Sequence, residues 1–252
     1  MNNIYNNYIS LGYFCSIAED LEKLGLRNQS SPFDWGISDF PSVIKAINTN
    51  FEGFMDYDNL SQSVTIRKHY RDDKFKFYFF HDFNEYKSLD AQYDSVKSKY
   101  FRRIERFLES IKQPTLFIRY ISTEELDENN KSIELTWIEN NYDYILNVLK
   151  KFNQQNKIIF IGDETLKSDK IKIYTVFKDD NDLVSRFPIY NNKELFPILS
   201  SIDFPNKQNN IERYNKKQKS YTYKIKTKIT CFLQKKFLKV YTHSKTYNIP
   251  NK

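Results

Sequence analysis

The chain contains 252 residues, of which 40% are hydrophobic and 17% aromatic, enough for one large domain with a substantial core. Two cysteines argue against a disulfide scaffold, and five glycines argue against a glycine-rich phosphate loop. The sequence shows no signal-peptide pattern and no run of about 18 apolar residues, so we expect a cytoplasmic protein with reduced thiols.

The positive charge is concentrated near the C-terminus. Residues 205–252 hold 13 of the 39 basic residues and one of the 32 acidic ones, Glu212, so that segment carries +12 and residues 1–204 carry −5. We therefore divide the chain into an α/β domain over 1–204 and a basic linker with an amphipathic tail over 205–252. Because the basic charge belongs to the tail, it does not indicate that the main domain binds nucleic acid, and we do not expect that partner.

The first half of the chain predicts a strand, three helices and a hairpin. In chain order we expect a strand at 9–11, a helix at 17–24, a loop at 27–35, a helix from Asp39, a hairpin of strands at 64–70 and 75–80, and a helix at 95–112. Gly25 is a natural end for the first helix, and Ser38 can cap the second.

The second half alternates strands and helices. We expect a strand at 115–120, a long helix at 133–152, and strands at 158–161 and 171–177, followed by a polar linker at 206–219. Nearly continuous apolar strands that alternate with helices are typical of a parallel sheet covered on both faces. The predicted fold is therefore α/β, a mostly parallel sheet flanked by helices, with an added β-hairpin and a basic helical C-terminal tail.

Cys15 lies where the first predicted strand meets the following helix. Unpaired backbone N–H groups and the positive end of the helix dipole stabilise a thiolate there, which makes the sulfur a better nucleophile near neutral pH. Cys15 is therefore the candidate nucleophile. The alternative is that it packs as a small core residue, as many free cysteines do.

His81 is the best placed of the three histidines to act as a base beside a thiol. It follows the Phe-rich run at 75–80, whereas His69 lies within the preceding strand and His243 in the tail. A catalytic base must reach the thiol by a hydrogen bond and be held by a third group. The alternative is a solvated histidine at a strand end.

Three acids could orient His81. Asp34 follows a proline and a phenylalanine in the loop, and Asp163 ends a predicted parallel strand, where ligands gather in open α/β sheets. Asp82 is the weakest of the three, because neighbours on a strand point to opposite faces. Each of these acids can equally cap a helix or close a turn.

Arg119 interrupts an otherwise apolar strand. A buried arginine needs a carboxylate or phosphate partner, so Arg119 could bind an anion. We favour the alternative, a structural ion pair, with Asp34 as the candidate partner. Three scattered histidines without a cysteine pair predict no metal site, and we expect no cofactor.

Residues 221–241 have the pattern of a basic amphipathic helix. Apolar residues recur near helical spacing, namely Ile225, Ile229, Phe232, Leu233, Phe237 and Val240. Lysines surround them, namely Lys224, Lys228, Lys235, Lys236 and Lys239. Such a helix can lie on an anionic membrane surface or dock on a partner, and the alternative is a helix packed on its own domain. Cys231 fills one face of this helix in either case.

Four segments in this order resemble a bacterial and viral family of papain-like cysteine peptidases without an established function. They are ISLGYFC at 9–15, SPFDW at 31–35, HDF at 81–83 and LFIRY at 116–120. The resemblance spans roughly residues 8–165, and members of the family often accompany surface-polysaccharide genes. It implies that Cys15 is the nucleophile and His81 the general base. The papain-like order of Cys, His and then Asp or Asn points to Asp163 as the third residue.

Two main functions follow. As a thiol hydrolase, the protein would use Cys15 to attack a carbonyl of a peptide, amide, ester or glycan-related substrate, while His81 transfers the proton. Asp34, Trp35 and Arg119 would contact that substrate. The alternative is a sugar- or nucleotide-binding α/β protein in surface-polysaccharide biosynthesis, with Asp34, Arg119 and Asp163 lining a cleft and no cysteine chemistry. A third possibility is a membrane-surface adaptor that works through the tail.

Overall fold

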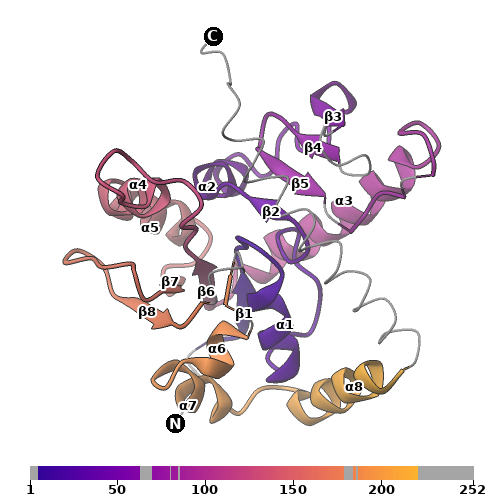
Figure 1. Cartoon of the computed structure of the whole chain (residues 1–252). Coiled ribbons are helices and arrows are strands. Elements are labelled where there is room, and N and C mark those ends of the chain that lie inside the picture. Colours follow the sequence, from indigo (N-terminus) through magenta and orange to yellow (C-terminus); the bar gives the residue numbers. More distant parts are fainter. Residues whose placement is uncertain are drawn as a thin grey trace.

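The computed structural model describes residues 5–62, 70–79, 81–84, 86–178, 184, 185 and 187–220. Its centre is a parallel sheet whose strands lie in the order β1 (Asn7–Ser10), β6 (Thr115–Tyr120), β7 (Lys157–Asp163) and β8 (Ile173–Val176). The predicted α/β class with a parallel sheet is confirmed (Figure 1).

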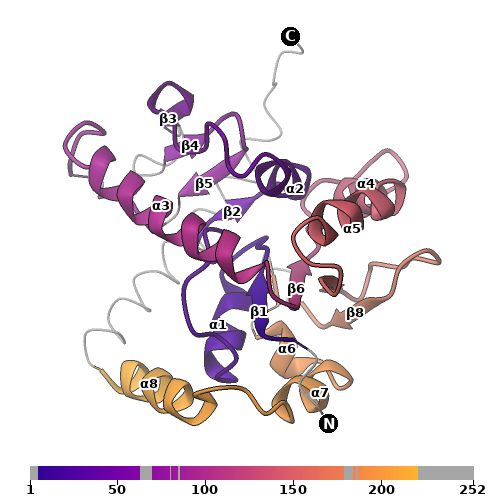
Figure 2. The same cartoon turned by 180° about the vertical axis from the view of Figure 1, so that it is seen from behind.

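Both faces of the parallel sheet are buried. Strand β6 shows the period-two alternation of a strand: Leu116, Ile118 and Tyr120 face one apolar cluster, and Phe117 faces the other. Figure 1 looks on to the face covered by α1 and α6, and Figure 2 looks on to the opposite face, which α3 and α5 cover. A sheet covered on both sides explains why its strands are nearly continuous apolar runs.

Eight α-helices lie among the described residues. They are α1 (Ser16–Lys23), α2 (Phe40–Asn48), α3 (Tyr93–Ser110), α4 (Ile133–Asn140), α5 (Tyr142–Lys150), α6 (Pro188–Asn191), α7 (Leu195–Ser200) and α8 (Lys207–Lys219). Two predicted helices differ from the structure. Asp39, not Ser38, caps α2, because its Oδ2 accepts a hydrogen bond from the Ser42 N–H at 3.0 Å. The predicted helix at 133–152 is broken at Asn141, whose φ of −123° leaves the helical region.

A second, antiparallel sheet contains the predicted hairpin. Its strands lie in the order β2 (Ile37–Ser38), β5 (Phe77–Phe79), β4 (Tyr70–Asp72) and β3 (Leu60–Gln62). The hairpin is confirmed as β4 paired with β5, although residues 63–69 lie outside the described part. Phe54, Phe79 and Tyr100 hold this sheet against α3 through edge-on and tilted ring contacts of 5.0–6.0 Å.

The prediction of a linker at 206–219 is wrong, because this segment forms α8, which packs against α1. Asn210 is buried and its Nδ2 donates to the Gly25 carbonyl at 3.2 Å and to Asn28 Oδ1 at 2.8 Å. These side-chain contacts hold a helix that carries little apolar surface.

The amphipathic segment at 221–241 lies outside the described residues, as do His69, Cys231 and His243, and the domain boundary at 204 stays a prediction. In the part of the chain that the structure describes, no helix has the length and apolar character needed to cross a membrane.

Candidate functional site

Cys15 is the residue immediately before α1, as the sequence predicts. Its thiol forms no disulfide and is half-buried, and it packs against the apolar cluster around Ile17 and Leu21 of the same helix. The N–H groups of the first helical turn have no acceptors within an α-helix, so they are directed toward the region in front of Cys15. This arrangement suits a thiolate or the oxyanion of a reacting carbonyl.

The turn between β1 and Cys15 depends on Gly12. Its φ of +84° favours glycine, and a Cβ there would lie 2.3 Å from Ser38 Oγ and 3.0 Å from Arg119 Nη1. The Ser38 N–H also donates to the Tyr13 carbonyl at 3.2 Å. The turn that leads to Cys15 is therefore in close contact with β2 of the antiparallel sheet.

Arg119 connects the turn before Cys15 with strand β2. Its side chain is completely buried, and its guanidinium donates to the Leu11 carbonyl, to Ser38 Oγ and to the Ser38 carbonyl, each at 2.9 Å. Nε and Nη2 donate to the two carboxylate oxygens of Glu134, both at 2.8 Å. The ion-pair partner is thus Glu134 and not Asp34, which corrects the expected pairing. All five N–H donors of Arg119 bond within the chain.

The sequence does not identify Glu134 as the partner of Arg119, because Glu134 is only one of several acids in a predicted helix. Burial raises the pKa of Glu134, and the Arg119 guanidinium opposes that rise. A single sequence contains no signal for this pair, because the partners lie on different elements that only tertiary packing brings together.

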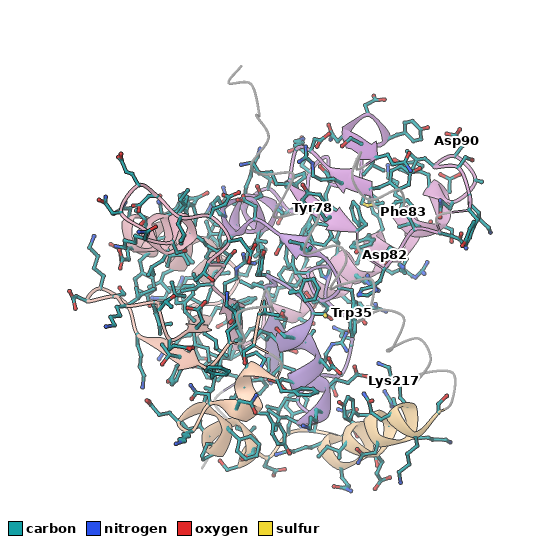
Figure 3. The ribbon with its side chains drawn as sticks, in the orientation of Figure 1. Trp35, Tyr78, Asp82, Phe83, Asp90 and Lys217 are labelled. Carbon is teal, nitrogen blue, oxygen red and sulfur yellow. The ribbon has the colours of Figure 1, made fainter. Side chains whose placement is uncertain are left out.

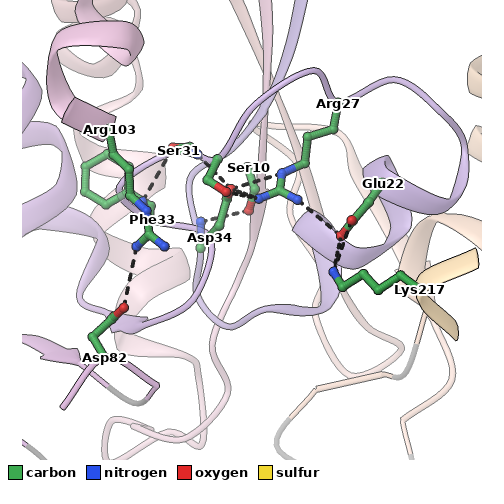
Figure 4. Close-up of polar contacts among 11 residues, drawn as sticks. Ser10, Glu22, Arg27, Ser31, Phe33, Asp34, Asp82, Arg103 and Lys217 are labelled. Carbon is green, nitrogen blue, oxygen red and sulfur yellow. Dashed lines mark hydrogen bonds and ion pairs between the residues drawn. The ribbon is translucent and has the colours of Figure 1, made fainter. Parts of the chain in front are cut away.

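Asp34 belongs to a separate polar cluster (Figure 4). Its Oδ2 accepts hydrogen bonds from Arg27 Nε at 3.1 Å, from Arg27 Nη2 at 2.6 Å and from the Ser31 N–H at 2.7 Å. Arg27 in turn contacts Glu22, which also pairs with Lys217 of α8 at 3.1 Å. Burial raises the pKa of Asp34, and the charge and hydrogen bonds of Arg27 oppose that rise. Asp34 therefore fixes the shape of the loop at 31–35.

Trp35 and His81 bring two of the sequence motifs together. Their rings meet edge to face with centroids 6.3 Å apart, and the Trp35 ring also has Arg27 at 5.2 Å and Lys217 at 5.7 Å. Trp35 lies between Asp82 and Lys217 in Figure 3. His81 keeps exposed surface, yet the protein packed around its imidazole lowers its pKa; the Asp82 carboxylate opposes this effect and Lys99 adds to it. A lowered pKa keeps the imidazole neutral, the form that a general base requires.

A short path through the antiparallel sheet connects the Cys15 turn with the His81 turn. β2 contacts Tyr13 through Ser38 and pairs with β5, where Ile37 lies opposite Tyr78. His81 follows Tyr78 by three residues. The motifs at 9–15 and 81–83 are therefore carried by neighbouring segments.

Asp163 ends β7, two strands away from β1, a separation of about 10 Å between strand axes. Its carboxylate accepts hydrogen bonds from the hydroxyl groups of Thr123 and Thr165, and Lys178 Nζ lies 3.4 Å from Oδ2. Burial alone would raise the pKa of Asp163, but these hydrogen bonds and the Lys178 ammonium lower it. The structure thus surrounds Asp163 with partners from the β6, β7 and β8 ends of the sheet.

These features define an α/β protein in which a thiol lies between a parallel strand and a helix N-terminus. The neighbouring antiparallel sheet is rich in aromatic residues, and the turn beyond its strand β5 carries a histidine. The chain belongs to the family described as "Putative papain-like cysteine peptidase (DUF1796)", whose model matches residues 6–141. It is also similar to an uncharacterized protein of Acanthamoeba polyphaga mimivirus, with 32% identity over 186 residues that cover 64% of this chain and 79% of that protein. No solved structure matches the chain. Cys15 and His81 lie within the family match, whereas Asp163 lies outside it.

Proposed function

We propose that this protein is a thiol hydrolase in which Cys15 is the nucleophile and His81 the general base. The observation that carries the proposal is the position of the Cys15 thiol, which lies directly before α1. In the reaction, the sulfur attacks the carbonyl carbon of a peptide, amide or ester, and His81 takes the thiol proton and gives it to the leaving group. Water then hydrolyses the acyl-enzyme and restores the thiol. The N–H groups of the first turn of α1 would bind the oxyanion.

The internal contacts of the other candidate residues favour this function over sugar or nucleotide binding. That alternative needs Asp34, Arg119 and Asp163 to contact a ligand. Each of them already has hydrogen-bond partners within the protein, and Arg119 uses all its donors. Trp35, which is half-buried beside His81, is the side chain that we assign to substrate contact.

Alkylation of single-thiol variants tests the proposal. The full-length Cys231→Ser variant keeps only Cys15, and the matched Cys15→Ser variant keeps only Cys231. We expect iodoacetamide to modify Cys15 much faster, with a rate that rises with pH along a curve centred below the ordinary thiol pKa of about 8.5. Equal and slow modification of both thiols would favour the binding protein.

Hydrolysis of p-nitrophenyl acetate, a small ester probe, tests the chemistry itself. Cys15→Ser and His81→Gln should each abolish a burst of p-nitrophenol that the unchanged protein and Cys231→Ser release. A burst of the same size in Cys15→Ser would refute Cys15 as the nucleophile.

We also propose that the C-terminal part of the chain contacts an anionic membrane surface. The exposed side of α8 carries Arg213, Lys216 and Lys219, and the basic sequence at 221–252 follows directly. Each basic residue near such a surface contributes about 1 kcal/mol of attraction. The full chain should sediment with vesicles that contain phosphatidylserine, and removal of residues 221–252 should weaken this binding. Equal binding to neutral phosphatidylcholine vesicles would argue against it.

A further inference from the structure

The turn that carries His81 is fastened to α3 by the next residue, Asp82. The Asp82 side chain is only 3% exposed. Its Oδ2 accepts a hydrogen bond from the buried Tyr100 hydroxyl at 2.6 Å, and its Oδ1 pairs with Lys99 and lies 3.8 Å from Arg103 Nη1. All three partners belong to α3, so the helix fixes the carboxylate from one side.

The two residues after Asp82 are fixed as well. The Phe83 ring packs on Tyr70 at 4.7 Å and on Phe79 at 5.6 Å. The Asn84 N–H donates to Gln92 Oε1 at 2.6 Å, and Gln92 Nε2 donates back to the Asn84 carbonyl at 3.1 Å. The backbone after His81 is thus held at three successive residues, while His81 itself keeps exposed surface beside Trp35.

Arg103 extends this arrangement to the loop at 31–35. Its guanidinium approaches Asp82, and its charge also acts on Asp34 (Figure 4). Trp35, the next residue after Asp34, contacts the edge of His81. The carboxylate that fixes the His81 turn and the loop that packs against the imidazole therefore share one cation.

We infer that Asp82 is the positioning residue of His81, in the role that the papain-like order of residues assigns to Asp163. Asp82 acts through the turn and through its charge, and does not contact substrate. Asp82 lies within the family match, whereas Asp163 lies beyond its end. The positioning role of Asp82 rests on the proposed function of His81 as a base. The anchoring of the His81 turn by Asp82 does not depend on that function.

The charges around the imidazole predict the direction in which the pKa of His81 should shift in each variant. The protein packed around the partly exposed imidazole lowers the pKa of His81, the Asp82 carboxylate raises it, and Lys99 lowers it. Arg103 lies 3.8 Å from Asp82, and Arg27 and Lys217 lie against the Trp35 ring, which packs on His81. Asp82→Asn should therefore lower the pKa of His81, and Lys99→Gln should raise it.

Proton NMR titration of the imidazole Cε1–H resonances tests this, with His81→Gln to assign the signal. Asp163→Asn is the matched control, because it removes a carboxylate that has its own partners elsewhere in the sheet. We expect a lower pKa of His81 in Asp82→Asn, a higher one in Lys99→Gln and no change in Asp163→Asn. Should Asp82→Asn fail to fold, the Lys99→Gln titration alone decides, and the absence of an upward shift would overturn the inference.

The same titration separates this inference from the proposed function. If Asp82→Asn leaves the pKa of His81 unchanged, or if Asp163→Asn changes it equally, Asp82 does not position His81. A hydrolase that releases the p-nitrophenol burst could still exist in that case. If the shifts occur and no burst is seen, Asp82 anchors a histidine without a catalytic partner. In an active protein, Asp82→Glu should restore part of the pH profile that Asp82→Asn shifts.

Discussion

Among the polar contacts near the candidate site, loss of the ion pair between Arg119 and Glu134 should lower the free energy of unfolding most. Arg119 is fully buried and the Glu134 side chain is 11% exposed, so Glu134→Ala leaves a guanidinium in the interior without its carboxylate. Breaking a buried pair on one side costs about 3–5 kcal/mol. Because domains are stable by only about 5–15 kcal/mol, this change should bring the protein close to unfolding.

An exposed ion pair provides the matched control. Lys172 and Glu194 lie 2.7 Å apart with side chains 63% and 66% exposed. Water and salt screen such a pair, so Glu194→Ala should cost only about 0.2–1 kcal/mol. Glu134→Gln should fall between the two alanine variants, because it keeps the shape and one acceptor but removes the charge.

Urea unfolding followed by far-UV circular dichroism at pH 7 measures all three variants. The difference in the free energy of unfolding between Glu134→Ala and Glu194→Ala should exceed about 2 kcal/mol, the gap between the two cost ranges. A difference below about 1 kcal/mol would refute the argument that burial, rather than distance, sets the strength of these pairs.

Two further predictions concern the helix that follows Cys15. Burial raises the pKa of Asp20 to about 7, so its ionisation should remove stability as the pH rises from about 4 through 7. Across that range, Asp20→Asn should gain up to about 4 kcal/mol in unfolding free energy relative to the unchanged protein, and parallel curves would contradict the assigned pKa. Gly25→Ala should cost about 1 kcal/mol or more, because φ is +72° and a Cβ would lie 2.5 Å from the Lys207 carbonyl oxygen. Hydrogen exchange in α8 should accelerate in that variant, while Ala at the exposed Asn209 should leave it unchanged.

The sequence predicts the parallel sheet well because its strands are buried on both faces. The strand at 115–120 has the predicted bounds, since a continuous apolar run leaves little doubt about where a covered strand begins and ends. The same reasoning fails at 206–219, where polar residues form α8. Asn210 and Tyr214 are buried there by contacts with the rest of the fold, and no local pattern announces such contacts.

The candidate site was predictable in part. Cys15 at the helix N-terminus follows from local pattern alone, because a strand, a turn and an amphipathic helix are each visible in the sequence. The partner of Arg119 was not predictable, because Asp34 and Glu134 are both plausible acids until packing decides between them. The alternation rule for strands made Asp82 the weakest candidate to orient His81. That rule does not apply, because Asp82 lies in a turn beyond β5 and not on the strand.

The family match ends at residue 141, at the break between α4 and α5, so it includes the antiparallel sheet but not α5, β7, β8 or α6 to α8. Two of the elements outside the match, α6 and α8, nevertheless contact α1, the helix that begins after Cys15. Asp20 of α1 accepts hydrogen bonds from the first turn of α6, and Asn210 of α8 bonds to Gly25 just beyond the end of α1. These C-terminal elements therefore support the middle of α1 and its C-terminal end.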